Sequence, residues 1–168
     1  NNNSTNFLEN DNWIKNLQIL EKNNLSFDLL INYYQFNQAS KVINLYPNIQ
    51  FIINHTLWPA GFNKEKFIFW KEAIKNISKY ENVSIKLSGF GENDSMWNEE
   101  RIKPFVHYSL EKFGIERCMF ATNFPVDRAF SSKSYIDYWN AYNNLTNDFS
   151  SKEKDNLFFK NAERYYRI

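Results

Sequence analysis

The sequence has few of the residues that build covalent cross-links or soft-metal sites. Its 168 residues include one cysteine, Cys118, and two histidines, His55 and His107. A single cysteine cannot form an internal disulfide, and this set of side chains cannot by itself make a Cys- or His-rich zinc site. Cys118 lies in an apolar run, which is typical of a buried small side chain rather than of a nucleophile.

Glycine and proline are also scarce, with four of each. The chain has no Gly-rich phosphate loop, and Gly89-x-Gly91 is too short to be a dinucleotide fingerprint. It contains no G-x-S-x-G elbow and no H-x-H or H-E-x-x-H pair. The common nucleotide-binding, serine-hydrolase and zinc-protease motifs are therefore absent.

Charge and long apolar runs are lacking as well. The formal net charge is +1, and the basic residues are scattered among acidic ones, so we expect no nucleic-acid partner. No apolar run approaches the roughly 20 residues that a membrane-spanning helix needs, and residues 1–6 do not resemble a signal peptide. We therefore expect no membrane association and a cytoplasmic location.

The chain does contain enough apolar material for one core, because 43% of its residues are hydrophobic and 18% are aromatic. We expect residues 1–10 to be frayed and residues 11–168 to form one domain. Apolar periodicity predicts an α/β fold in which helices alternate with parallel strands. The expected helices cover residues 11–22, 36–46, 64–80, 99–113, 135–145 and 151–159, and the expected strands cover residues 25–33, 49–54, 83–87 and 118–122.

Polar side chains follow each predicted strand at its carboxyl end, where parallel α/β proteins place their chemistry. Each has an ordinary explanation of its own: Tyr34 as a rim residue, His55 as a hydrogen-bonded structural residue, Lys86 as a surface lysine and Asn123 as a turn-former. Their shared position favours a common pocket instead. Alternation along residues 83–87 predicts that Lys86 points inward, and His107 is expected on a helix surface.

Six short segments of the chain form a recognisable series. They are Leu-Ser-Phe-Asp-Leu at 25–29, Ile-Asn-His-Thr at 53–56, Ile-Lys-Leu-Ser-Gly at 85–89, Phe-Gly-Ile-Glu-Arg at 113–117, Cys-Met-Phe-Ala-Thr-Asn-Phe-Pro-Val-Asp at 118–127 and Asn-Ala-Glu-Arg-Tyr-Tyr-Arg-Ile at 161–168. Together they resemble the carboxyl-terminal part of the amidohydrolase-related proteins, the group that contains sugar-lactone and pyrone-dicarboxylate lactonases. The resemblance begins at about residue 13, runs to the end of the chain and keeps the family's order and spacing.

The resemblance implies the last four strands, about strands five to eight, of a TIM-type (β/α)₈ barrel. It implies that His55 polarises a substrate carbonyl and that Asn123 lies where many relatives carry a water-activating aspartate. An amide cannot take a proton as a carboxylate does, so Asn123 would orient water without acting as a base. Many relatives have a histidine where this chain has Tyr34, and both departures weaken the case for a metal.

Two functional hypotheses follow. The favoured one is a lactonase-like hydrolase half with His55 and Asn123 as catalytic residues. In it Asp127 lines the water side, and Tyr34, Lys86 and Ser88 face the substrate. The other hypothesis is a non-catalytic barrel half that binds a ligand or complements a second chain.

Either hypothesis predicts a partner, because four strands do not close an eight-stranded barrel. The partner would be a chain supplying the first half or a second copy of this chain, unless the sequence is part of a longer protein. We expect a divalent metal of the zinc type only if a first half supplies a His-x-His motif.

Overall fold

A computed structural model describes residues 6–59 and 63–168 of the chain. It contains a four-stranded sheet in the order β1-β2-β3-β4, comprising β1 (Phe27–Leu29), β2 (Phe51–Ile53), β3 (Val83–Leu87) and β4 (Cys118–Phe120). All three strand pairs are parallel. The predicted α/β class and parallel sheet are confirmed, and the sheet is consistent with part of a barrel.

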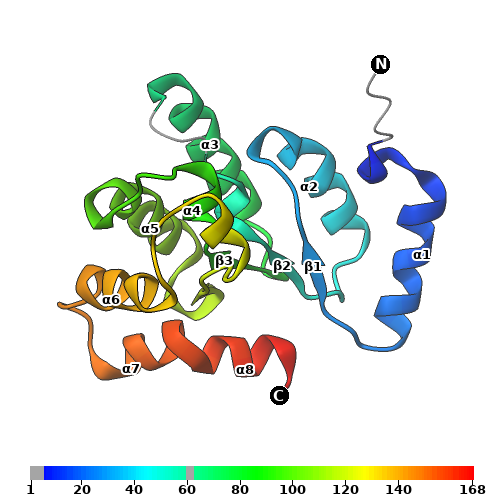
Figure 1. Cartoon of the computed structure of the whole chain (residues 1–168). Coiled ribbons are helices and arrows are strands. Elements are labelled where there is room, and N and C mark those ends of the chain that lie inside the picture. Colours follow the sequence, from blue (N-terminus) through cyan, green and yellow to red (C-terminus); the bar gives the residue numbers. More distant parts are fainter. Residues whose placement is uncertain (1–5, 60–62) are drawn as a thin grey trace.

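Helices connect the strands and continue beyond the last one (Figure 1). The predicted bounds of the first, fourth and fifth long helices agree with the structure, and the Asn63 side chain caps the helix that begins at Lys64. In place of the predicted final helix over 151–159, the structure has the helix Ser151–Asp155 and a π-helical turn Asn156–Lys160, and a further helix, Asn161–Tyr166, follows beyond the predicted end. The helices are α1 (Asp11–Lys22), α2 (Phe36–Leu45), α3 (Lys64–Ile77), α4 (Phe90–Asn93), α5 (Glu99–Phe113), α6 (Tyr135–Leu145), α7 (Ser151–Asp155) and α8 (Asn161–Tyr166).

Residues near the amino terminus differ from the expectation of fraying. Residues 1–5 lie outside the described part of the chain, but Phe7–Glu9 forms a 3₁₀ turn capped by the side chain of Asn6. Leu8 of this turn is buried in the core, which gives the segment a reason to be ordered.

Two of the strands are much shorter than their apolar patterns suggest. The ladder between β1 and β2 pairs Phe27 with Phe51 and Leu29 with Ile53, although residues 25–33 alternate throughout. Beyond the ladder Ile31 is still buried while Leu30 is half exposed. The alternation of apolar and polar residues therefore reflects which side chains are buried. This burial extends further along the chain than the hydrogen-bonded pairing of the strands does.

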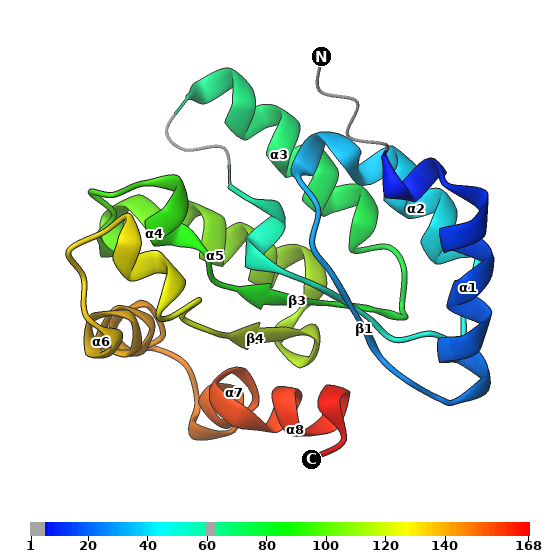
Figure 2. The ribbon, with the colours of Figure 1, turned by 45° about the vertical axis from the view of Figure 1, so that its right-hand side comes forward.

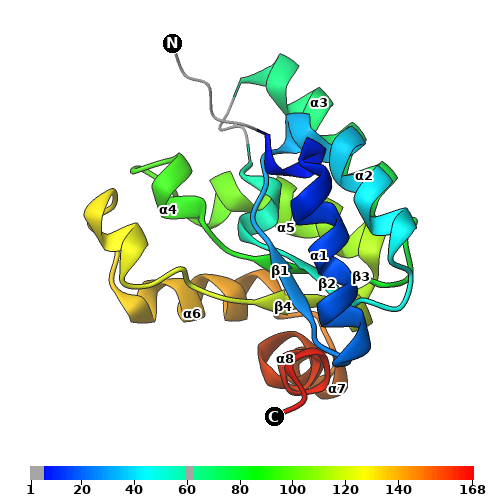
Figure 3. The same ribbon diagram turned by 90° about the vertical axis from the view of Figure 1, so that its right-hand side faces the viewer.

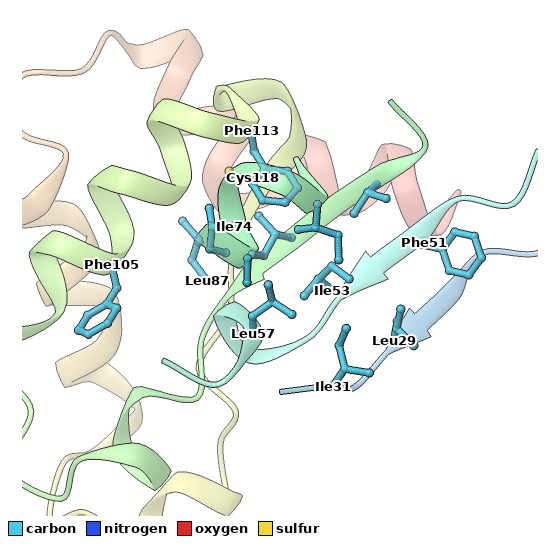
Figure 4. Close-up of a cluster of buried hydrophobic side chains, with 14 of the residues drawn as sticks. Leu29, Ile31, Phe51, Ile53, Leu57, Ile74, Leu87, Phe105, Phe113 and Cys118 are labelled. Carbon is cyan, nitrogen blue, oxygen red and sulfur yellow. The ribbon is translucent and has the colours of Figure 1, made fainter. Parts of the chain in front are cut away.

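The two faces of the sheet differ in chemistry. The face that packs against the helices carries Phe51, Ile53, Val83, Ile85 and Leu87, all fully buried in the main core (Figure 4). Because side chains alternate along a strand, Lys86 points to the other face, as predicted.

Helices α2 and α3 lie above the strands in the views of Figures 2 and 3, whereas α7 and α8 lie below them. From α8 the chain end returns to β1, where the Tyr166 hydroxyl donates to Asp28 Oδ1 at 2.7 Å. The Ser26 hydroxyl donates to the carbonyl oxygen of Tyr165 at 2.8 Å. The residues 161–168, which we call the carboxyl-terminal strap, thus join the last part of the chain to its first strand.

Across residues 6–59 and 63–168, the structure has no helix of the length and hydropathy required to span a bilayer.

Candidate functional site

His55 begins an unusual turn at the carboxyl end of β2. Residues 55–58 have φ values of 50°, 54°, 58° and 50°, so four successive non-glycine residues are left-handed. This conformation is costly for L-residues and persists only where the surroundings enforce it. Thr56 supplies that enforcement: its hydroxyl donates to the Ser88 carbonyl oxygen at 3.1 Å, its Oγ1 accepts from the Ser88 N–H at 3.0 Å, and its carbonyl oxygen accepts from the Trp70 indole at 2.8 Å.

The turn places the His55 imidazole beside the end of β3. Its Nδ1 atom lies 3.0 Å from the Oγ atom of the fully buried Ser88. Burial, and next the nearby Lys86 ammonium, lower the pKa of His55 below 6.5, while Asp127 and Asp28 oppose this shift. The imidazole is therefore mainly neutral at pH 7.

Asn123 occupies the corresponding position after β4 and also has a left-handed backbone, with φ 53°. Its amide Nδ2 donates to Asp127 Oδ1 at 2.8 Å. Asp127 is 0% exposed, and its other oxygen accepts from the Gly91 N–H at 3.0 Å and the Tyr138 hydroxyl at 2.7 Å. Burial raises the pKa of Tyr138 far above its usual range, so this phenol remains a donor.

A third polar group of the site, Glu92 on α4, was missed by sequence reasoning. Its Oε2 atom lies 3.5 Å from Asn123 Nδ2. Burial and the Asp127 charge raise the pKa of Glu92, and the hydrogen bond from Asn123 opposes the shift. The one signal in the sequence was its place four residues after Ser88, directly behind Gly89-x-Gly91.

Two glycines let the chain between β3 and α4 pass between these groups. A Cβ at Gly89 would lie 2.6 Å from the His55 Cβ, and one at Gly91 would lie 2.4 Å from the Tyr138 hydroxyl oxygen. The segment therefore touches the His55 turn at one end and the Asp127 network at the other. His55, Ser88, Asn123 and Asp127 are thereby connected through one short stretch of backbone.

Lys86 points to the face opposite the main core, where it forms an ion pair with Asp28 at 2.9 Å. Its ammonium also lies 5.6 Å from the ring centroid of Tyr166 in the carboxyl-terminal strap. The inward lysine thus has the partner that its position required.

Tyr34 is placed differently from the other predicted site residues. It follows β1 at the same edge of the sheet, but its side chain is 65% exposed and its ring packs on Tyr33 with centroids 5.6 Å apart. With Phe36, Phe69 and Glu72 these tyrosines line a hollow of about 340 Å³. His107 is exposed on α5, as expected.

The described residues do not offer a metal site of their own. Within residues 6–59 and 63–168 no three His, Cys, Asp or Glu side chains are grouped so that they could hold an ion. Asp127 is fully buried, and its oxygens already accept from three donors. The donor set of the described residues therefore does not fit a bound metal.

The polar arrangement can do specific chemistry without such an ion. A neutral imidazole, an oriented carboxamide and a carboxylate with a raised pKa are suited to polarise a carbonyl and to handle the proton of a water molecule.

Comparison with known proteins shows which family the chain is similar to. The family model described as Amidohydrolase matches residues 4–168. The uncharacterized protein y4mH of Sinorhizobium fredii is 36% identical over 156 residues, covering 93% of this chain and 52% of that protein. The L-rhamnono-gamma-lactonase of Scheffersomyces stipitis is 26% identical, covering 93% of this chain and 53% of that protein. The chain spans about half the length of these relatives.

Solved structures share the fold. An amidohydrolase from Burkholderia multivorans, solved with bound zinc, matches with a TM-score of 0.88 at 19% identity, covering 96% of this chain and 59% of that one. A putative 2-pyrone-4,6-dicarboxylic acid hydrolase from Pseudomonas putida matches with a TM-score of 0.74 at 15% identity, covering 95% and 58%. The four-stranded sheet is thus similar to part of a larger amidohydrolase fold.

Proposed function

Because the chain belongs to the amidohydrolase family, we propose that it carries part of a hydrolytic site that opens lactones or related cyclic esters. The lactonase relative and the structural likeness to a pyrone-dicarboxylate hydrolase support this substrate class. In this proposal β1 to β4 are the last four strands of a (β/α)₈ barrel.

The contact between His55 and Ser88 carries the proposal. When the Ser88 hydroxyl donates to Nδ1 across the 3.0 Å separation, the proton of the neutral imidazole resides on Nε2. Nε2–H then donates to the carbonyl oxygen of the lactone and stabilises the negative charge that develops on it. Ser88 acts here as a positioning residue, and the lowered pKa of His55 keeps the ring in the form with one donor and one acceptor.

Asn123 lies on the water side of the proposed site. Its Nδ2 is committed to Asp127 at 2.8 Å, which leaves the amide oxygen to accept a hydrogen bond from water. Asp127 has no exposed surface, so it acts through Asn123 instead of touching the substrate itself. Both residues keep the water-side role expected from the sequence.

Lys86 and Tyr34 are proposed to face the substrate at greater distance from the reacting carbonyl. Lys86 supplies a positive charge on the inner face, where it is held by Asp28 at 2.9 Å. Tyr34 lines its own hollow beyond β1 and would contact only an extended substrate.

The proposed partner is a protein segment that supplies the remaining strands, either on another chain or on a second copy of this one. The alternative function, a non-catalytic half that binds a ligand or complements a partner, shares this requirement. This alternative is favoured because the chain matches only about half the length of its relatives.

Hydrolysis of a panel of γ- and δ-aldonolactones tests the proposal. The chain is assayed in its associated form, as its own oligomer or with the segment that supplies the remaining strands, and acid release is followed by a pH indicator. We expect turnover above the spontaneous rate for at least one lactone. A rate equal to the spontaneous rate for every lactone in that form would contradict the hydrolase and leave the binding alternative.

A further inference from the structure

We propose that Glu92 is the general base of this site and takes the proton from the attacking water that Asn123 orients. This inference rests on the proposed lactone hydrolysis and adds the residue that the hydrolysis requires. The position after β4 holds an amide, which cannot accept a proton from water. A base must therefore come from elsewhere in the site.

Geometry selects Glu92 from the charged groups of the site. Its carboxylate approaches Asn123 Nδ2 at 3.5 Å, on the same amide group that Asp127 holds at 2.8 Å. In this proposal the attacking water donates one proton to the Asn123 amide oxygen and the other to Glu92 Oε2, which keeps free lone pairs. Glu92 is half-buried, so it reaches solvent as well as the site.

The other groups fail as the base for structural reasons. Asp127 is closed to solvent, and its oxygens already accept from Gly91, Tyr138 and Asn123. His55 has one ring nitrogen occupied by Ser88 and uses the other on the carbonyl. Lys86 is held in its ion pair with Asp28.

The environment of Glu92 suits the task. Partial burial raises the pKa of Glu92, and the nearby buried Asp127 carboxylate acts in the same direction. A carboxylate with a raised pKa is a stronger base toward the proton of water.

The reaction is balanced with these groups alone. Water attacks the lactone carbonyl carbon, a C–O bond forms, and one water proton passes to Glu92. The carbonyl oxygen becomes an oxyanion that His55 Nε2–H stabilises. The ring C–O bond then breaks, the proton moves from Glu92 to the leaving alkoxide oxygen, and the product is the open-chain hydroxy acid.

The test compares three variants in the lactone assay with the full chain. Glu92→Gln keeps the shape and removes the basic oxygen, and Glu92→Ala opens space for a small external base. Glu65→Gln, on the exposed start of α3, is the matched control. We expect Glu92→Gln to lower kcat by about 10²-fold or more and Glu65→Gln to leave it unchanged.

Chemical rescue separates a base from a structural carboxylate. We expect formate to restore part of the kcat of Glu92→Ala in a concentration-dependent way, without affecting His55→Ala. Wild-type hydrolysis that survives in Glu92→Gln, or a loss in Glu92→Ala that formate does not restore, overturns the assignment and leaves the proposed function intact. Absence of hydrolysis by the wild-type chain in its associated form, as its own oligomer or with the segment that supplies the remaining strands, overturns the proposed function and the assignment together.

Discussion

The Nδ1 atom of His55 and the Oγ atom of Ser88 lie 3.0 Å apart, although 33 residues separate them in the chain. Strand β3 brings them together, because Ser88 directly follows the last residue of β3. The backbone of Ser88 also forms two hydrogen bonds with the side chain of Thr56, the residue after His55. An imidazole fixed in this way presents its second nitrogen in one orientation. The site thus combines the fixed imidazole of His55 with the fixed carboxamide of Asn123.

Removal of His55 tests this arrangement. We expect His55→Ala to lower lactone turnover by about 10² to 10³-fold, the usual effect of losing a preorganised contact to an oxyanion. His107→Ala is the control, because that histidine is exposed on α5 and should leave turnover unchanged. Steady-state kinetics of both variants decide the question, and equal losses would remove His55 from the mechanism.

The lowered pKa of His55 predicts a pH effect of definite sign. The folded chain holds the imidazole neutral, so the unfolded chain takes up the proton first as pH falls. The contribution of His55 to stability is complete above about pH 6.5, the unperturbed value, and is lost as pH falls through the lowered pKa of the folded state.

A lysine variant makes this effect measurable. Lys86 lowers the pKa of His55, so we expect the NMR titration midpoint of His55 to rise in Lys86→Met. Lys41→Met, at an exposed position on α2, should leave the midpoint where it is in the wild type. A midpoint that does not move in Lys86→Met would show that Lys86 has no electrostatic effect on the imidazole.

Two glycines with nearly the same φ predict different costs on substitution. Gly89 and Gly114 have φ values of 75° and 76° but ψ values of 18° and 159°, and a Cβ at Gly114 meets nothing within 4 Å. We expect Gly114→Ala to cost about 1 to 3 kcal/mol of unfolding free energy from its backbone conformation alone, which is one that glycine almost exclusively adopts. Gly89→Ala should cost more, because its Cβ would lie 2.6 Å from that of His55. Urea unfolding of both variants tests this order, and equal costs would contradict the close approach.

The carboxyl-terminal strap should contribute strongly to stability through Asn161. Its buried amide donates to the carbonyl oxygens of Ile115 and Cys118, both at 2.7 Å. Asn161→Ala leaves two acceptors without this donor, and we expect a loss of about 2 kcal/mol or more. Asn144→Ala removes an exposed contact to Glu99 and should cost about 0.5 kcal/mol or less. Similar losses in the two variants would disprove the special role of Asn161.

The edge of the sheet at β1 predicts that the chain associates. The sheet ends at β1, where the backbone groups of Asp28 point away from β2 because Phe27 and Leu29 make the bonds to that strand. We expect the purified chain to self-associate or to require a partner at micromolar concentration. Sedimentation velocity checks this, and a stable monomer with cooperative unfolding would contradict the need for further strands.

The sequence alone predicted the elements whose caps and periodicity lie within one short segment. Caps and periodicity located α1, α5 and α6 correctly, and alternation along β3 predicted which way Lys86 points. The lengths of β1 and β2 were overestimated, because burial and pairing produce the same alternation.

Other features depend on contacts between distant segments and left no local signal. The left-handed turn at His55 contains threonine, leucine and tryptophan, which turn rules do not associate with positive φ. Glu92 joins the site only because Gly89 and Gly91 fit between His55 and Tyr138. Its neighbours come from β4 and the loop after it, so residue spacing around position 92 carries no information about them.

The contact of Asn161 with Cys118 also affects how copies of this chain can polymerise. Ala121 donates to Leu87 across the sheet, so by alternation the Cys118 carbonyl points to the free edge of β4, where Asn161 occupies it. Open-ended stacking of sheets needs two receptive edges on every subunit. A neighbour meets free backbone groups at β1, but at β4 it must displace the Asn161 amide from the Cys118 carbonyl. A partner that completes the barrel meets this cost once, whereas a growing filament would meet it at every subunit.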